Sequence, residues 1–254
     1  MPKKLYYYCS ETTFMSIISG KSIWLTSLNT TNDYLEGRWY LKLISEADMP
    51  EKNKRAILSL FGSMLVNYHG FAMCLSGKGD LLSQWRGYAD NGAGYVIGFN
   101  YDNLRSIFGE PSQAEVKKVE YASELSSTAL RRVDLAMEQM NFQFIDDTYQ
   151  FTVSVEANKI FEYFYSLKSD AFSEEDEWRI LSLHEYNNLK DLQFRHTKNG
   201  ISPYKAIPFN SKSQIISNIT LGPRNRTDAD ILKQYLKSAG FSKVEVKRSK
   251  LSYR

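Results

Sequence analysis

The sequence predicts an α+β fold with mainly antiparallel sheets and flanking helices. Runs typical of strands and runs typical of helices alternate irregularly, without the repeated strand–helix–strand order of a parallel sheet. Aromatic residues make up 14% of the 254 residues, including 17 tyrosines and 14 phenylalanines, and such residues favour strands. No internal repeat or low-complexity linker divides the chain, so we expect a single domain over residues 1–254.

The expected elements follow from the spacing of apolar residues. Short apolar runs predict strands at residues 5–9, 23–26, 71–76, 95–99, 116–121, 177–184, 214–221 and 244–247. Helical spacing predicts helices at residues 11–19, 35–45, 51–68, 81–89 and 228–239, with a turn or two at 101–108. A longer helical pattern predicts a helical insertion at 126–166. Gly20 and Gly240 are candidate helix stops, and Thr227 is a candidate N-cap.

Composition excludes several classes of protein. The formal net charge is only +3, which is too small to indicate a polyanionic partner by itself. Cys9 and Cys74 form no C-x-x-C pair, and there are three histidines, so we expect no metal site. Two cysteines suit a reducing cytoplasm. The chain shows neither an apolar leader nor a run of 18 apolar residues, so we expect a cytoplasmic protein without a membrane span.

Residues 172–181, Phe-Ser-Glu-Glu-Asp-Glu-Trp-Arg-Ile-Leu, contain the main catalytic candidate. The first half reads as an acidic turn, and the second half reads as a strand that enters a core. Glu177 therefore lies where an exposed turn becomes a buried strand. A carboxylate held there can stabilise developing positive charge, provided that it faces a cleft. The alternative is that the acidic residues form only a solvated loop.

Several short segments resemble the motifs of a large bacterial family of uncharacterised domains. They are LYYY at 5–8, IWLT at 23–26, NDYLE at 32–36, CLS at 74–76, QWRGYA at 84–89, Lys168, and EDEWR at 175–179. Their order and spacing agree with the family from residue 5 to about residue 185, and ITLG at 219–222 fits a later strand. The chain departs from the pattern at Tyr34, Leu75 and Gln84, where the family usually has proline, phenylalanine and methionine.

That family is similar, more distantly, to the ADP-ribosyltransferase fold, through the order of its strands and one late glutamate. The resemblance implies a core of two mainly antiparallel sheets and NAD as the substrate. Glu177 would stabilise the ribosyl cation that forms as nicotinamide leaves. The implied cofactor-binding residues are Trp85 or Tyr88 for stacking on nicotinamide, Tyr8, Ser10 and Ser27 for the ribose or carboxamide, and Arg86 for the pyrophosphate.

Each of these residues also has a structural interpretation. Tyr8 can pack on a sheet, and Trp85 can be a core residue. Asn32 and Asp33 can cap the helix that follows them. Glu36 and Arg179 can form an ion pair that fixes geometry.

These motifs do not identify the acceptor of the ADP-ribosyl group. The C-terminal segment is basic, and a basic surface beside a cleft attracts nucleic acid, although it can also be only a solvated end. The resemblance to transferases of toxin and phage-defence systems implies a nucleic-acid acceptor, RNA rather than DNA, and a neutralising antitoxin partner. The alternatives are a non-catalytic nucleotide or nucleic-acid sensing domain and an NAD hydrolase. A Glu177 side chain locked in the interior would count against the enzyme.

Overall fold

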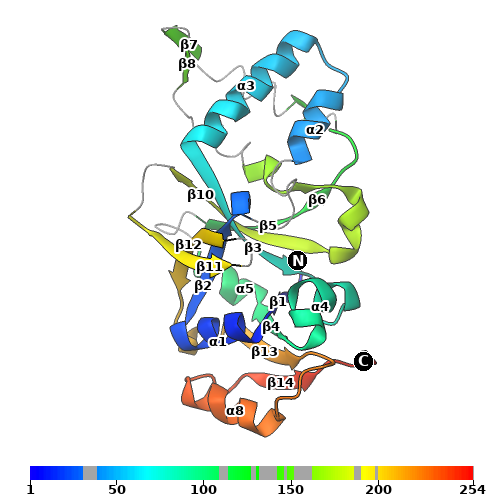
Figure 1. Ribbon diagram of the computed structural model, residues 1–254, viewed down its shortest axis with the longest axis vertical. Helices are drawn as coiled ribbons and strands as arrows, with labels where there is room; N and C mark the ends of the chain where they lie inside the picture. The colour runs from blue at the N-terminus through cyan, green and yellow to red at the C-terminus, as the bar shows by residue number, and fades with distance from the viewer. Residues whose placement is uncertain are drawn as a thin grey trace.

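The computed structural model describes residues 1–30, 39–108, 114–126, 130–131, 142–145, 148–151, 162–185, 190–197 and 200–253. It is a mixed α+β structure with a large, mainly antiparallel sheet (Figure 1). The helices α2 and α3 and the hairpin β7–β8 lie at one end of the long axis, and α8 and β14 lie at the other. The predicted fold class is confirmed at this level.

The described strands, in chain order, are β1 (Lys4–Cys9), β2 (Ser22–Ser27), β3 (Tyr68–Ser76), β4 (Tyr95–Asn100), β5 (Ala114–Lys118), β6 (Glu120–Tyr121), β7 (Phe142–Ile145), β8 (Thr148–Phe151), β9 (Leu167–Lys168), β10 (Glu177–Glu185), β11 (Leu192–Thr197), β12 (Gly200–Pro208), β13 (Ile216–Leu221) and β14 (Glu245–Arg248). The described helices are α1 (Glu11–Gly20), α2 (Trp39–Glu46), α3 (Glu51–Asn67), α4 (Leu82–Tyr88), α5 (Tyr101–Arg105) and α8 (Ala229–Ser238). Short 3₁₀ turns are η1 (Leu28–Thr30), η2 (Asp90–Gly92), η3 (Asp170–Glu175) and η4 (Ser211–Ser213).

The strand β3 organises the large sheet, whose order is β11-β12-β2-β3-β1-β4-β13-β14. β10 pairs with β3 along its whole length and with β5 on its other side. The remaining edge of β3 is shared, since β2 pairs with it at Phe71 and Ala72, and β1 pairs with it at Ser76. The sheet therefore divides between β1 and β2. The structure thus has one large divided sheet, with the small pairs β6–β9 and β7–β8 as separate sheets, where the resemblance implies a core of two sheets.

Side-chain alternation assigns the two faces of the sheet to different clusters. Trp178 and Ile180 of β10 join a core with residues of α1, α5 and α8. Leu181 lies on the opposite face, in a second cluster with buried residues of α2 and α3. Glu177 and Arg179 share that second face, because they precede Leu181 by four and two residues along the strand.

Most predicted elements are confirmed, and three predictions are wrong in part. Within 126–166, expected as a helical insertion, the described residues include the antiparallel pair β7–β8, and most of the remainder lies outside the described residues. The N-cap of α8 is Asp228 and not Thr227, because the Asp228 carboxylate accepts hydrogen bonds from two backbone N–H groups. Gly240 follows this helix with φ of 93°, as expected for a stop. α1 ends at Gly20, but the left-handed residue is Lys21, with φ of 47°.

Candidate functional site

Glu177 is the first residue of β10, as the sequence predicts. The preceding acidic segment forms η3, and Asp176 then takes a left-handed conformation, with φ of 43°, that turns the chain into the strand. The backbone N–H of Glu177 donates a hydrogen bond of 2.7 Å to the hydroxyl of Tyr121. The position of this carboxylate is thus fixed by a turn, a strand and a tyrosine.

The Glu177 carboxylate is bound by a cation on each oxygen. Lys168 Nζ donates to Glu177 Oε2 at 2.8 Å, and Arg179 Nε donates to Glu177 Oε1 at 2.7 Å. Lys168 Nζ also donates to Glu175 Oε2 at 2.6 Å, and an Arg179 terminal nitrogen donates to the backbone carbonyl of Tyr165 at 2.7 Å. We call Lys168, Glu175, Glu177 and Arg179 the charged cluster. Its two positive and two negative side chains give the cluster a net charge of zero.

The charged cluster is buried: Glu177 is 4% exposed, Lys168 7% and Arg179 0%. The expectation that Glu177 faces an open cleft is therefore wrong in this structure, and this counts against the simplest form of the enzyme hypothesis. A ribose hydroxyl can reach the carboxylate only after the cover around it is displaced. Glu175, with a side chain 16% exposed, is the member of the cluster nearest to solvent.

Burial alone would raise the pKa of Glu177, but the positive charges of Arg179 and Lys168 outweigh it and lower the pKa to about 2. Burial would likewise lower the pKa of Lys168, yet the carboxylates of Glu177 and Glu175 raise it above its ordinary value. Both groups are therefore charged at neutral pH. An ionised, immobile carboxylate suits electrostatic stabilisation of a cation better than it suits proton transfer.

The loop that follows β3 holds the turn before Glu177. Gly77 N–H donates to the Asp176 carbonyl at 2.8 Å, and the Ser76 hydroxyl donates to the Glu175 carbonyl at 2.6 Å. Lys78 Nζ donates to the Glu174 carbonyl at 3.1 Å. A Cβ atom at Gly77 would overlap the Asp176 carboxylate, so any other residue there would require the Asp176 side chain to move.

Tyr8 and Trp85 hold the other side of this loop. The Tyr8 hydroxyl donates to the Lys78 carbonyl at 2.9 Å and accepts from Leu81 N–H at 2.8 Å. Trp85 is 0% exposed, and its indole N–H donates to Asp80 at 2.7 Å. The two rings pack edge to face with centroids 5.2 Å apart. In this arrangement they position the loop, as the structural interpretation expects, and present almost no surface to nicotinamide.

Replacing Tyr8 by phenylalanine is expected to lower the free energy of unfolding by about 1–3 kcal/mol, because it removes both hydrogen bonds made by the hydroxyl of a side chain that is only 5% exposed. Urea denaturation followed by circular dichroism measures this change. An unchanged midpoint would show that water replaces the hydroxyl at no cost.

The other predicted cofactor residues fall into two groups. Ser10 caps α1, since its hydroxyl accepts from Thr13 N–H at 3.2 Å, and Ser27 is 1% exposed with its hydroxyl accepting from Asn29 N–H at 3.3 Å. Arg86 and Tyr88 lie on the exposed face of α4, where Tyr88 is 52% exposed. The first pair is engaged in local structure, and the second is accessible to a ligand but lies outside the charged cluster.

Sequence reasoning missed two partners of Glu177. Lys168 is part of the family resemblance, but its sequence position does not show that it lies between two carboxylates. Tyr121 closes β6, and nothing in its sequence surroundings marks it. Asn32, Asp33 and Glu36 lie outside the described residues. The structural interpretation of Arg179 as an ion-pair residue is supported, with Glu177 as its described carboxylate partner.

Among the residues that the structure describes, no group of three or more histidine, cysteine, aspartate or glutamate side chains is arranged to hold a metal ion. In the same part of the chain, no helix has both the length and the apolar character needed to cross a lipid bilayer.

Comparison with known proteins gives one match. A family model described as a protein of unknown function (DUF2971) matches residues 84–180, which include α4, Lys168, Glu177 and Arg179. Neither a curated protein nor a solved structure matches the chain. Over the stretch that includes the charged cluster, the chain is therefore similar to a family whose function is unknown.

Proposed function

We propose that the chain is an NAD-dependent ADP-ribosyltransferase with a divided, ADP-ribosyltransferase-like sheet. The supporting observation is the convergence on β3 of three strands that carry candidate residues. Tyr6 of β1 and Glu177 of β10 both pair with Ser76, and Ser27 of β2 pairs with Phe71. Segments far apart in sequence thus meet around the point where the sheet divides.

The chemistry requires Glu177 to leave part of its ion pairing. In the proposed mechanism, Lys168 stays with Glu175 and releases Glu177 Oε2, which then accepts a hydrogen bond from the ribose 2′-hydroxyl. Arg179 continues to hold Oε1. As the bond to nicotinamide breaks, the freed oxygen stabilises the positive charge on the ribosyl ring. The acceptor then attacks the ribosyl C1′.

We propose a nucleic-acid acceptor, with RNA preferred to DNA. Such a transferase fits a toxin or phage-defence effector, whose uncontrolled activity would harm its own cell. A neutralising partner protein is therefore part of this proposal. The exposed Arg86 and Tyr88 of α4 remain the proposed contacts for the pyrophosphate and the nicotinamide ring.

The test replaces Glu177 by glutamine, which preserves shape and removes the charge. Transfer of label from NAD to RNA is expected to fall at least about 100-fold, the effect of removing one group that stabilises a transition state. Glu174→Gln is the matched control, because Glu174 belongs to the same turn, is exposed, and lies outside the charged cluster. Rates are normalised to the folded fraction measured by circular dichroism. Equal rates for both variants would reject the catalytic role.

A second function is favoured by the burial of the charged cluster. If the cations never release Glu177, the chain is a domain that senses a nucleotide or nucleic acid without turnover. The Glu177→Gln variant then binds the ligand as tightly as the natural chain does, and neither protein releases nicotinamide from NAD. Free ADP-ribose without a labelled macromolecule would instead indicate an NAD hydrolase.

A further inference from the structure

Positive charge is concentrated in the last part of the chain. Residues 222–254 contain nine lysines and arginines against three acidic residues, which gives +6, whereas the whole chain carries only +3. This segment forms α8, β14 and the stretch that follows them, at one end of the molecule (Figure 1). Every lysine and arginine described between residues 222 and 253 is exposed. We call residues 222–253 the basic end.

The acidic residues of the basic end neutralise few of these cations. Asp228 is engaged at the N-terminus of α8, Asp230 pairs with Lys233 at 2.8 Å, and Glu245 pairs with Lys247 at 3.0 Å. Six cations have no carboxylate within ion-pair distance among the described residues. They are Arg224, Arg226, Lys237, Lys243, Arg248 and Lys250, of which Arg248 donates to the backbone carbonyls of Asn225 and Thr227.

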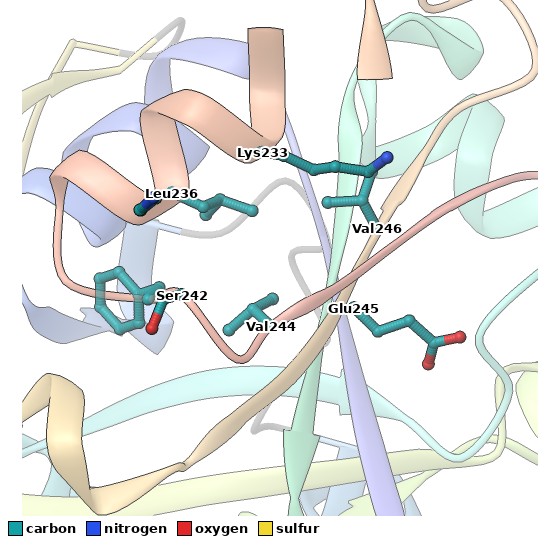
Figure 2. A pocket seen from close by; sticks show the side chains of 8 residues that line it. Lys233, Leu236, Ser242, Val244, Glu245 and Val246 are labelled. Atoms are coloured by element: carbon teal, nitrogen blue, oxygen red, sulfur yellow. The ribbon is translucent and has the colours of Figure 1, made fainter. Parts of the chain in front are cut away.

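A hollow of about 400 Å³ lies between α8 and β14. Figure 2 shows Leu236, Val244 and Val246 around it, with Lys233 at its rim. Lys237 also lines it, from the last turn of the helix. A partly apolar recess with ammonium groups at its edge suits a flat ring attached to a phosphate.

The basic end is also connected to the charged cluster. Asp80 accepts hydrogen bonds from the Ser249 hydroxyl at 2.6 Å and from Lys250 N–H at 2.8 Å. The same loop donates, through Gly77, to the turn that precedes Glu177. Nearby, the guanidinium of Arg224 lies 6.0 Å from the centre of the Tyr253 ring. The C-terminal part of the basic end therefore packs against that loop.

We infer that the basic end is a docking surface for single-stranded nucleic acid, whose phosphates contact the unneutralised cations and one of whose bases enters the hollow. A base inside a duplex is stacked and paired and cannot enter a recess, so the surface selects single strands. This inference deepens the proposed function by naming where the acceptor binds. Its test uses no NAD, so either proposal can fail without the other.

The test measures binding of a fluorescent 12-nucleotide single strand, as RNA and as DNA, by anisotropy over a series of salt concentrations. The variant Lys237→Gln with Lys243→Gln removes one cation that lines the hollow and a second, exposed cation that lies in sequence between the lining residues Ser242 and Val244. We expect affinity to fall about tenfold or more at 0.1 M salt, and the slope of log K against log salt to fall by about 1.4, since each single-strand phosphate contact contributes about 0.7. Lys52→Gln with Arg55→Gln on α3 is the matched control, expected to leave both quantities unchanged.

Photo-cross-linking gives a second, variant-free measurement. An oligonucleotide that carries 4-thiouridine is expected to cross-link to peptides within residues 233–247. Cross-links confined to other parts of the chain, equal losses in the two double variants, or displacement of the oligonucleotide by duplex of the same length would overturn the inference. So would equal or tighter binding to anionic lipid vesicles, which would make the basic end a membrane-surface contact.

Discussion

Replacing Arg179 by alanine is expected to lower the free energy of unfolding by about 3–5 kcal/mol, the cost of removing one partner of a buried ion pair. Arg179 is 0% exposed and holds both Glu177 Oε1 and the Tyr165 carbonyl. Its loss leaves a buried carboxylate with Lys168 as its only described cation, and it removes the hydrogen bond from Arg179 to the Tyr165 carbonyl. Urea denaturation at pH 7, followed by both fluorescence and circular dichroism, measures the change.

Arg55→Ala is the control for the Arg179 experiment. Arg55 lies on α3 with a side chain 80% exposed and pairs with Glu51 at 3.6 Å, so its removal is expected to cost at most about 0.5 kcal/mol. A similar, small loss in both variants would mean that water enters the Arg179 site and solvates Glu177. That outcome would also make the charged cluster accessible to a ligand without a large opening.

The placement of Glu177 at the start of a strand could be predicted from local pattern alone. Acidic turn residues followed by Trp178, Ile180 and Leu181 predict a strand that begins near Glu177, and the register of β10 with β3 confirms it. Gly240 could be predicted as a helix stop because helices often end in a left-handed backbone conformation, which glycine adopts without strain. Such signals are local, and a single sequence contains them completely.

Other features depend on which segments meet in space. Lys168 lies on β9, which pairs with β6, and its side chain reaches both Glu175 and Glu177; no spacing rule in the sequence states that contact. The strands β11 and β12 were missed because β11 is largely exposed and β12 contains Pro203 and Pro208, residues that usually argue against a strand. In the sheet, Pro203 lies where β12 pairs only with β11, and Pro208 lies where β12 pairs only with β2. Each proline therefore has one side without a ladder partner, where proline is tolerated.

The candidate site shows the same division between local and non-local information. The sequence marks Tyr8 and Trp85 as aromatic candidates for a ligand site, but it does not show that both make their hydrogen bonds to the loop at 77–81. A residue that completes such a loop and a residue that stacks on a ligand have the same sequence signature. Only the exposure of the side chain in the structure distinguishes the two roles. Tyr8 and Trp85 are both buried, so they stabilise the loop.

The burial of the charged cluster has an energetic consequence for either function. The attraction between its members offsets a desolvation cost of several kcal/mol for each ion, so releasing one partner is costly unless a ligand replaces it. A ribose hydroxyl is a weaker partner for Glu177 than an ammonium group. An enzyme of this design therefore needs binding energy from the rest of NAD to open the site, which predicts that a truncated substrate loses rate as well as affinity.

Acid unfolding tests whether the cluster holds Glu177 ionised in solution. The pKa of Glu177 falls from an ordinary value of 4.5 to about 2 on folding, so ionisation of this group stabilises the folded state by about 3 kcal/mol above pH 4.5. A depressed pKa gives stability that is lost as the pH falls, here between pH 4.5 and 2. Urea denaturation at closely spaced pH values is expected to show this loss in the natural chain. In Glu177→Gln the free energy of unfolding is expected to fall by about 3 kcal/mol less between pH 4.5 and 2, because glutamine has no carboxylate that takes up a proton. Parallel curves for the two proteins would mean that the carboxylate titrates normally and that its cations are not in place.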